Sequence, residues 1–345
     1  MFFVCGFVFD MVTVDRVDSW LTIAQQALYL AVVTAVLTQM FFAPEVPQPA
    51  PEGAPLLKRS YYRYRIAILS FLLGGLLNLY TIFFFKSSSL LVSAAFLVLL
   101  VVLLVLNELN HFKWLGLSFK FALLSLCGLS FCATVVPVFV GQIGMAVFLL
   151  SMAVGCVPMV GLAWSIRKRS PAQFPRVRNQ ILVPFGMVLV AFLAAYLLKV
   201  IPPVPLSIPF IGVYHSVERT KDEYRLSHER PAWRFWHNGD QEFRAQPDDR
   251  VFVFFRVFSP TRFADEVRMR WYLHQERGWV LQDTIPIKIT GGRAEGFRGY
   301  GFKSKYQPGE WKVQIETTDE REIGRVYFTL DTVPTSPRNF VVDIQ

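Results

Sequence analysis

Glu108 and His111 have the spacing in this chain that comes closest to a metal centre. A Glu-x-x-His pair lies on one face of a helix, and di-iron bundles use such pairs as ligands. That chemistry needs a second pair and two further carboxylates, and the apolar segments of the chain offer none. We therefore interpret Glu108 as part of a solvated helix end, and we expect no metal and no cofactor.

Asn78 lies in the middle of an apolar segment, after Gly74-Gly75 and beside Tyr80. A polar group inside a membrane segment marks either a helix–helix hydrogen bond or a functional site. The first interpretation makes Asn78 a packing contact next to a close-packed glycine surface. The second places Asn78 and Glu108 in an intramembrane polar site that contacts lipid or a small solute.

Sequence motifs for catalysis are missing from this chain. It contains no Gly-x-Ser-x-Gly, no His-Glu-x-x-His and no P-loop. The cysteines show neither a zinc spacing nor a disulfide framework, and they lie in apolar segments. They are Cys5, Cys127, Cys132 and Cys156, whereas the C-terminal histidines are scattered at His215, His228, His237 and His274. We expect a protein that is not an enzyme.

Trp233, Arg234 and Trp236 form an aromatic and basic cluster that also contains Phe235 and His237. Rigid aromatic side chains and arginine are enriched at binding hot spots. The cluster has two interpretations: core and interface packing, or a patch that binds a glycan or a partner protein.

The elements that position these residues divide at Pro202-Pro203-Val204-Pro205. The hydrophobic content of 53% and the mean hydropathy of +0.38 are high for a soluble protein. Before the division, apolar stretches approach the roughly 20 residues that cross a bilayer. The predicted spans are 20–42, 66–85, 88–106, 117–138, 143–164 and 181–201. Whether residues 1–14 belong to a further span stays open.

Most of the net charge of +9 resides in loops between apolar segments. Residues 1–204 hold 14 basic and 6 acidic groups, whereas the rest of the chain is almost neutral, with 21 and 20. A neutral C-terminal region argues against nucleic-acid binding, which needs a basic face on a soluble domain. Lys58 and Arg59 precede the second predicted span, and Arg167, Lys168 and Arg169 follow the fifth. The positive-inside rule then places the C-terminal region outside the cytoplasm.

The C-terminal region reads as short strands separated by turns. Residues 251–258 are apolar on both faces, which is typical of a central strand. Period-two alternation of apolar and polar residues predicts strands near 267–274, 285–290, 311–316 and 326–331. Lys312, Gln314 and Glu316 are expected to face water, and the glycine-rich residues 296–301 are expected to form an irregular edge strand or bulge. Strands at this spacing favour an antiparallel, immunoglobulin-like sandwich.

Several motifs in this region resemble the bacterial family known as domain of unknown function 2914. They are Arg270-Trp271, Gly291-Gly292-Arg293, Gly296-Phe297-Arg298-Gly299-Tyr300, Pro308-Gly309-Glu310-Trp311-Lys312-Val313 and Ile323-Gly324-Arg325-Val326-Tyr327-Phe328. The resemblance covers residues 251–332, and a helical bundle before such a domain is also similar to membrane proteins of that family. It implies a bacterial protein and carries over no activity and no site residues.

Together these patterns predict a transmembrane α-helical bundle of about six spans in residues 1–204. A linker and juxtamembrane segment, 205–246, and an all-β sandwich, 247–345, are expected to follow. We expect a multi-pass protein of the bacterial inner membrane, with a periplasmic β-domain that binds a partner protein or envelope component. Accessory-subunit and homo-oligomeric forms are both compatible with the sequence. The alternative is a bundle that handles lipid or a small solute, with the β-domain as a regulatory cap.

Overall fold

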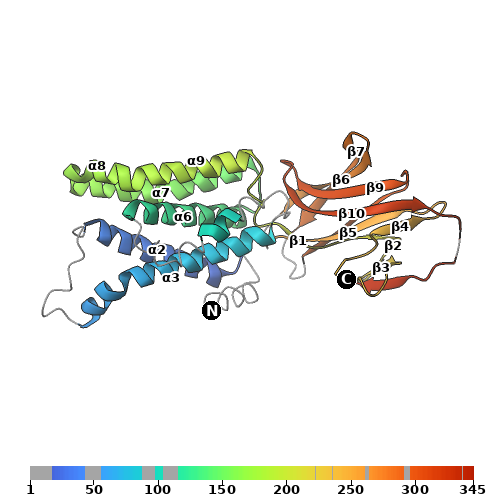
Figure 1. Cartoon of the computed structure of the whole chain (residues 1–345), viewed down its shortest axis with the longest axis horizontal. Helices are drawn as coiled ribbons and strands as arrows, with labels where there is room; N and C mark the ends of the chain where they lie inside the picture. The colour runs from blue at the N-terminus through green and yellow to red at the C-terminus, as the bar shows by residue number, and fades with distance from the viewer. Residues whose placement is uncertain are drawn as a thin grey trace. The chain divides into compact units, whose positions relative to one another are not determined.

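The computed structural model describes residues 18–42, 56–87, 98–103, 116–221, 223–234, 236–260, 264–290, 296–335 and 337–345. They form two compact units, which Figure 1 shows as coiled ribbons and as arrows. The first unit is helical and ends at Ile201, and Pro202–Gln345 makes up most of the second, β-rich unit.

In the described residues, the helical unit contains four long helices, a composite one and the short helical stretch 98–103. The long helices are α2 (Trp20–Phe42), α3 (Leu56–Lys86), α6 (Leu117–Val140) and α7 (Met145–Arg169). The composite helix joins η1 (Pro171–Gln173), α8 (Phe174–Val177), η2 (Arg178–Leu182) and α9 (Val183–Leu197). All five are long and apolar enough to cross a membrane. They correspond to five of the predicted spans; of the sixth, 88–106, only residues 98–103 are described, and they are helical.

Pro184 explains the π-helical turn at η2. Proline has no N–H to donate to the carbonyl four residues earlier, and its ring clashes with that carbonyl. The widened turn Arg178–Leu182 absorbs this defect, and the helix continues as α9 with Pro184 in its first turn. Helix α9 ends at Leu197, four residues before the predicted end, because Lys199 adopts a positive φ and Pro202 follows.

The helices differ in how much apolar surface they bury against one another. Most of the apolar stretch of α3 and of α6 is buried, whereas α2, α7 and α9 leave most of theirs exposed. Exposed side chains on α7 and α9 include Leu149, Val157, Met187 and Val190. An apolar surface of this extent fits a lipid environment rather than water.

The described part of the β-rich unit forms three sheets. The five-stranded sheet has the order β4-β10-β9-β6-β7, and the three-stranded sheets have the orders β1-β5-β8 and β11-β3-β2. The strands are β1 (Ser207–Tyr214), β2 (Ser216–Thr220), β3 (Glu223–His228), β4 (Glu242–Ala245), β5 (Val251–Phe258), β6 (Ala264–Gln275), β7 (Gly278–Thr290), β8 (Phe297–Lys303), β9 (Gly309–Thr317), β10 (Glu322–Thr332) and β11 (Val341–Ile344).

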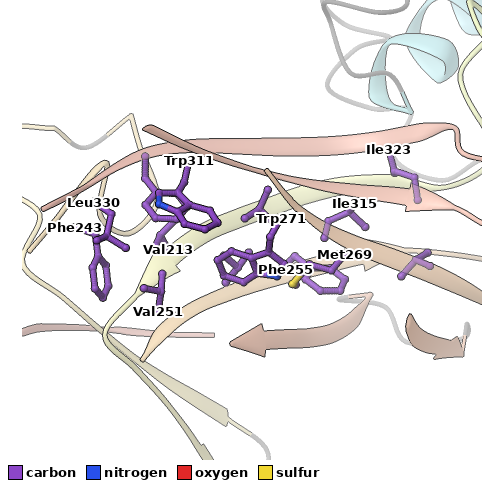
Figure 2. Close-up of a cluster of buried hydrophobic side chains, with 14 of the residues drawn as sticks. Val213, Phe243, Val251, Phe255, Met269, Trp271, Trp311, Ile315, Ile323 and Leu330 are labelled. Carbon is purple, nitrogen blue, oxygen red and sulfur yellow. The ribbon is translucent and has the colours of Figure 1, made fainter. Parts of the chain in front are cut away.

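The core of this unit lies between the five-stranded sheet and the sheet of β1, β5 and β8. Figure 2 shows side chains of both sheets within it, including Phe255 from β5 beside Trp271 from β6. The Trp271 and Trp311 rings meet edge to face at 6.5 Å between centroids, and the Trp311 indole N–H donates to the Gln307 carbonyl at 2.9 Å. The two sheets pack face to face as a sandwich, and burial of the two tryptophan side chains removes a large apolar area from water.

Strands β5, β6, β7, β9 and β10 occupy the positions predicted from the sequence. β5 is the central strand of its sheet, as its apolar character on both faces predicts, and β8 is an edge strand. The expectation of a purely antiparallel fold is wrong at one pair, because β4 runs parallel to β10. The unit is therefore rich in antiparallel pairs without being uniform.

The segment 205–246 is not a linker, because it forms β1, β2, β3 and β4. Its strands lack the clean alternation that the sequence argument needs: β1 contains Pro209, and β2 is only five residues long. Pairing with other strands determines these strands instead, and β5 and β11 among the partners are distant in the chain. β1 pairs with β5, and β3 pairs with β2 and β11.

At Gly239, the segment before β4 lies in close contact with β1. The Gly239 φ of +63° is one that L side chains rarely adopt, and an added Cβ would lie 2.1 Å from the Val213 carbonyl oxygen. The next residue, Asp240, donates its main-chain N–H to that carbonyl at 2.8 Å. Only glycine permits this approach, which sets the path of the chain from Trp233 to β4.

We predict that Gly239→Ala lowers the free energy of unfolding of the β-rich unit by about 3 kcal/mol or more, through backbone clash and φ strain. The measurement is the denaturant midpoint of tryptophan fluorescence for the full-length protein in detergent, since five of the eight tryptophans lie in this unit. The control is Gly278→Ala, at φ +106° with no atom within 4 Å of an added Cβ. Equal losses in the two variants would contradict the role given to Gly239.

Candidate binding groove

Trp233, Arg234 and Trp236 lie in the connection between β3 and β4, on the surface of the β-rich unit. Trp233 and Trp236 are 61% and 59% exposed, and their rings meet edge to face at 5.7 Å between centroids. The Arg234 guanidinium lies 4.8 Å from the centre of the Trp233 ring and pairs with Glu242 at 2.9 Å. Of the two sequence-based interpretations, this exposure is compatible with a binding patch.

Trp236 lines a groove of about 610 Å³. The groove combines flat aromatic surfaces with polar groups that can donate or accept hydrogen bonds, a mixture typical of recognition sites. Its lining comes from β1, the connection before β4, the start of β7, β9 and β10: Ile211, Trp236, His237, Asn238, Gln241, Trp279, Glu310, Trp311, Arg325, Val326, Tyr327, Phe328 and Thr329.

The edge of β10 that borders this groove is only partly paired. β4 pairs with Thr329–Thr332 of β10, and among the described residues no other strand pairs with β10 on that side. The Thr329 N–H points toward β4, because it donates to the Gln241 carbonyl at 2.7 Å. Main-chain groups of alternate residues in a strand point the same way. The N–H and C=O groups of Tyr327 and Arg325 therefore face the groove.

The outer face of the five-stranded sheet continues from the groove as an aromatic and charged surface. The Tyr327 and Trp279 rings lie 5.7 Å apart, and the Lys312 ammonium lies 5.1 Å from the Trp279 ring and 4.4 Å from the Tyr272 ring. Arg270 pairs with Glu316 at 3.1 Å.

Long side chains from β6 and β10 thus cover the central strand β9. For this reason Lys312, Gln314 and Glu316 are buried, and the prediction that they face water is wrong. Ion pairs and cation–π contacts compensate the loss of hydration of these polar side chains.

A second, smaller pocket of about 270 Å³ has Arg234 of the Trp233–Trp236 segment in its lining. The ends of β3 and β4 and the residues before β11 form it, and three arginines are among its lining residues. These residues are Glu229, Arg230, Pro231, Arg234, Asp240, Gln241, Glu242, Arg244 and Asn339. Gln241 lines both the pocket and the groove, so the two are neighbours.

Asp240 belongs to a buried charged cluster behind this pocket. Its carboxylate accepts the Glu229 N–H at 3.0 Å and lies 3.6 Å from His215 Nε2. Arg338 completes the cluster, pairing with Asp249 at 2.8 Å. Burial raises the pKa of Asp240 to about 7. Burial, with Arg338 adding to it, lowers the pKa of His215 to about 4. Both groups are therefore driven toward their neutral forms.

The polar pair predicted within the membrane segments is Asn78 and Glu108. Asn78 is buried within α3. Glu108 lies outside the described residues, so the proposed polar pair with Asn78 stays a prediction. Among the described residues, no group of three or more His, Cys, Asp and Glu side chains is arranged to hold a metal ion.

Sequence reasoning missed Trp279, Arg325 and the cluster around His215. Arg325 and Tyr327 alternate with the partly buried Val326 and the buried Phe328 of β10, and this outward position was the available signal for the groove. The His215 cluster gives no comparable signal, because it joins residues as distant as His215 and Arg338.

Comparison with known proteins identifies one domain. Residues 264–330, from β6 to β10, match the family model described as "Protein of unknown function (DUF2914)". The C-terminal region contains a DUF2914 domain. The match confirms the resemblance predicted from the sequence motifs, and it includes Tyr327, Trp279 and Arg325 of the groove. No curated protein matches the chain.

Solved structures offer only weak likenesses to the chain that carries this DUF2914 domain. An immunoglobulin-like protein from Pseudomonas aeruginosa is 10% identical, with 37% of this chain and 98% of that chain covered and a TM-score of 0.23. A Listeria innocua β-glucosidase in complex with glucose is 12% identical over 26% of this chain, at a TM-score of 0.20, and the chain spans only 15% of its length. A Pseudomonas fluorescens alkylpurine DNA glycosylase is 10% identical, with 90% of this chain and 98% of that chain covered and a TM-score of 0.24. Scores this low carry no argument about fold or activity.

We predict opposite pH effects for two variants of the buried pair. The neutral form of Asp240 stabilises the fold fully below pH 3.8, and this stability is lost as pH rises through about 7. The neutral form of His215 stabilises the fold above pH 6.5, and this stability is lost as pH falls through about 4. The two contributions oppose each other between pH 4 and 6.5.

Relative to wild type, the unfolding free energy of Asp240→Asn should therefore rise with pH across this window, by about 1.4 kcal/mol per pH unit. The unfolding free energy of His215→Asn, again relative to wild type, should fall with rising pH by a similar amount per pH unit. Denaturant titrations of the full-length protein in detergent at several pH values measure both differences. Parallel pH curves for wild type and either variant would contradict the assignment.

Proposed function

We propose that this protein is a non-enzymatic membrane protein that uses its DUF2914-containing β-domain to dock an extended segment of a partner protein along β10. The helical unit anchors and orients that domain, and the protein acts as an accessory subunit of a membrane complex. The observation that carries the proposal is the groove beside β10, where the main-chain groups of Tyr327 and Arg325 face outward.

An added peptide strand satisfies such main-chain groups directly. Strand addition to an open sheet edge obtains affinity from main-chain hydrogen bonds and specificity from pockets for alternate side chains. Trp236, Trp279 and Tyr327 supply rigid aromatic surfaces beside that edge. A glycan would use the aromatic surfaces but has no regular main chain to pair with β10, so a peptide fits the groove better.

We also propose that the β-domain has the fold of an immunoglobulin-like sandwich. In such domains a buried tryptophan on strand C packs between two facing sheets. Trp271 of β6 has this character, and β6 lies between β9 and β7 as strand C lies between F and C′.

We propose further that the protein lies in the inner membrane of a bacterium and that its β-domain lies outside the cytoplasm. The distribution of charge supports this orientation: Arg167, Lys168 and Arg169 occupy the last turn of α7, and Lys58 and Arg59 lie near the start of α3. The connection of residues 141–144 between α6 and α7 carries no charge.

Single cysteines test this orientation. In a variant whose four native cysteines are replaced by alanine, we expect Ser304→Cys, at an exposed site of the β-domain, to react with a membrane-impermeant maleimide in cells with a permeable outer membrane. Arg169→Cys, exposed at the end of α7, should react only after the inner membrane is opened. The reverse pattern would contradict the orientation.

A photo-crosslinking residue in place of His237, which lines the groove, tests the docking itself. We expect one defined adduct in intact cells, and mass spectrometry should map it to an extended peptide of a single protein. Tyr300, exposed on β8 of the other sheet, is the control position and should give no such adduct.

Tyr327→Pro should abolish the adduct formed at position 237. Proline removes the Tyr327 ring together with an N–H that faces the groove, whereas the main-chain bonds to β9 remain and the fold is retained. Tyr327→Ala removes the ring but keeps the N–H and should weaken the adduct only in part. An unchanged adduct in a folded Tyr327→Pro variant, or an adduct that contains glycan alone, would contradict strand addition.

A further inference from the structure

The three-arginine pocket beside the groove also contains three carboxylates, from Glu229, Asp240 and Glu242, which neutralise its cations only in part. Arg234 pairs with Glu242 at 2.9 Å. Glu229 pairs at 4.0 Å with Arg338, which does not line the pocket, and burial raises the pKa of Asp240 to about 7 even though the charge of Arg230 lowers it. In the described part of the chain, no ion pair involves Arg230 or Arg244.

The guanidinium of Arg230 also has an N–H group that no acceptor satisfies. Its Nη1 donates weakly to the Arg234 carbonyl at 3.4 Å, whereas its enclosed Nε has no hydrogen-bond partner. A buried donor without a partner costs free energy, and a ligand acceptor would recover that cost. Arg244 is exposed on the outer face of β4, and the neighbouring Asn339 adds an amide. Guanidinium groups arranged around a small pocket suit a planar carboxylate.

The position of the pocket relates it to the groove. Gln241 lines both cavities, and its carbonyl accepts the Thr329 N–H at the point where β4 stops pairing with β10. A peptide strand lying along Tyr327 and Arg325 therefore comes to its end beside the pocket.

We propose that the pocket of Arg230, Arg244 and Asn339 binds an Asp or Glu side chain of the docked peptide, so that the partner segment is acidic. This inference rests on the proposed strand addition at β10. It adds a selectivity that the open edge alone does not provide, since main-chain pairing is indifferent to side-chain charge. One carboxylate hydrogen-bonded by a guanidinium contributes on the order of a tenfold change in affinity.

The test is selection of a random 12-residue peptide display library on the full-length protein in an uncharged detergent. Wild type should enrich peptides with Asp or Glu at one fixed position. The Arg230→Gln/Arg244→Gln double variant should still select peptides but lose that enrichment. It should also bind a wild-type-selected peptide about tenfold more weakly. A version of that peptide in which Gln replaces the enriched Glu should bind the wild-type protein and the double variant equally. Arg268→Gln, on β6, is the matched control and should keep the preference.

The outcomes separate the inference from the proposed function. Selection of peptides without acidic enrichment by wild type would overturn the acidic pocket and leave strand addition standing. Acidic peptides that bind Tyr327→Pro as well as wild type would overturn strand addition together with the inference drawn from it. Enrichment retained in the double variant would overturn the role of Arg230 and Arg244. Failure to select any peptide would overturn both proposals.

Discussion

The short parallel pairing between β4 and β10 is the constraint on which the surface of the β-rich unit depends. β4 reaches only the last four residues of β10, and the hydrogen bond from the Thr329 N–H to the Gln241 carbonyl marks where the pairing begins. If β4 began a few residues earlier, it would cover the main chain of Tyr327 and Arg325. Because it does not, the sheet keeps an edge beside a groove, and natural sheets ordinarily protect such edges.

Buried polar contacts hold the chain that leads into β4. Gly239 brings the backbone against the Val213 carbonyl, and Asp240 accepts the Glu229 N–H while facing His215. These contacts orient the turn that carries Trp233 and Trp236 between the two cavities. The aromatic side chains are thus exposed on a well-supported segment, which reduces the entropy lost when a ligand orders them.

The sequence predicted the elements whose signals are local. Apolar length identified α2, α6 and α7, and alternation identified β6, β9 and β10, because burial of one face or of a whole segment leaves a regular pattern. β1 and β3 were not identified, because their positions depend on pairing with β5 and β11 far along the chain. The aromatic cluster at Trp233–Trp236 was found from residue type alone. The groove was not, because Trp279 and Tyr327 join Trp236 only through the sheet.

Amide hydrogen exchange along β10 in the full-length protein tests the open edge most directly. The account predicts alternation: the Tyr327 and Arg325 amides should exchange much faster than those of Val326 and Phe328, which face β9. Residue-resolved exchange by NMR or by fragmentation mass spectrometry distinguishes these amides. A Tyr327 amide as protected as that of Phe328 would mean that the edge is already covered, and the account of the groove as a docking site would be wrong.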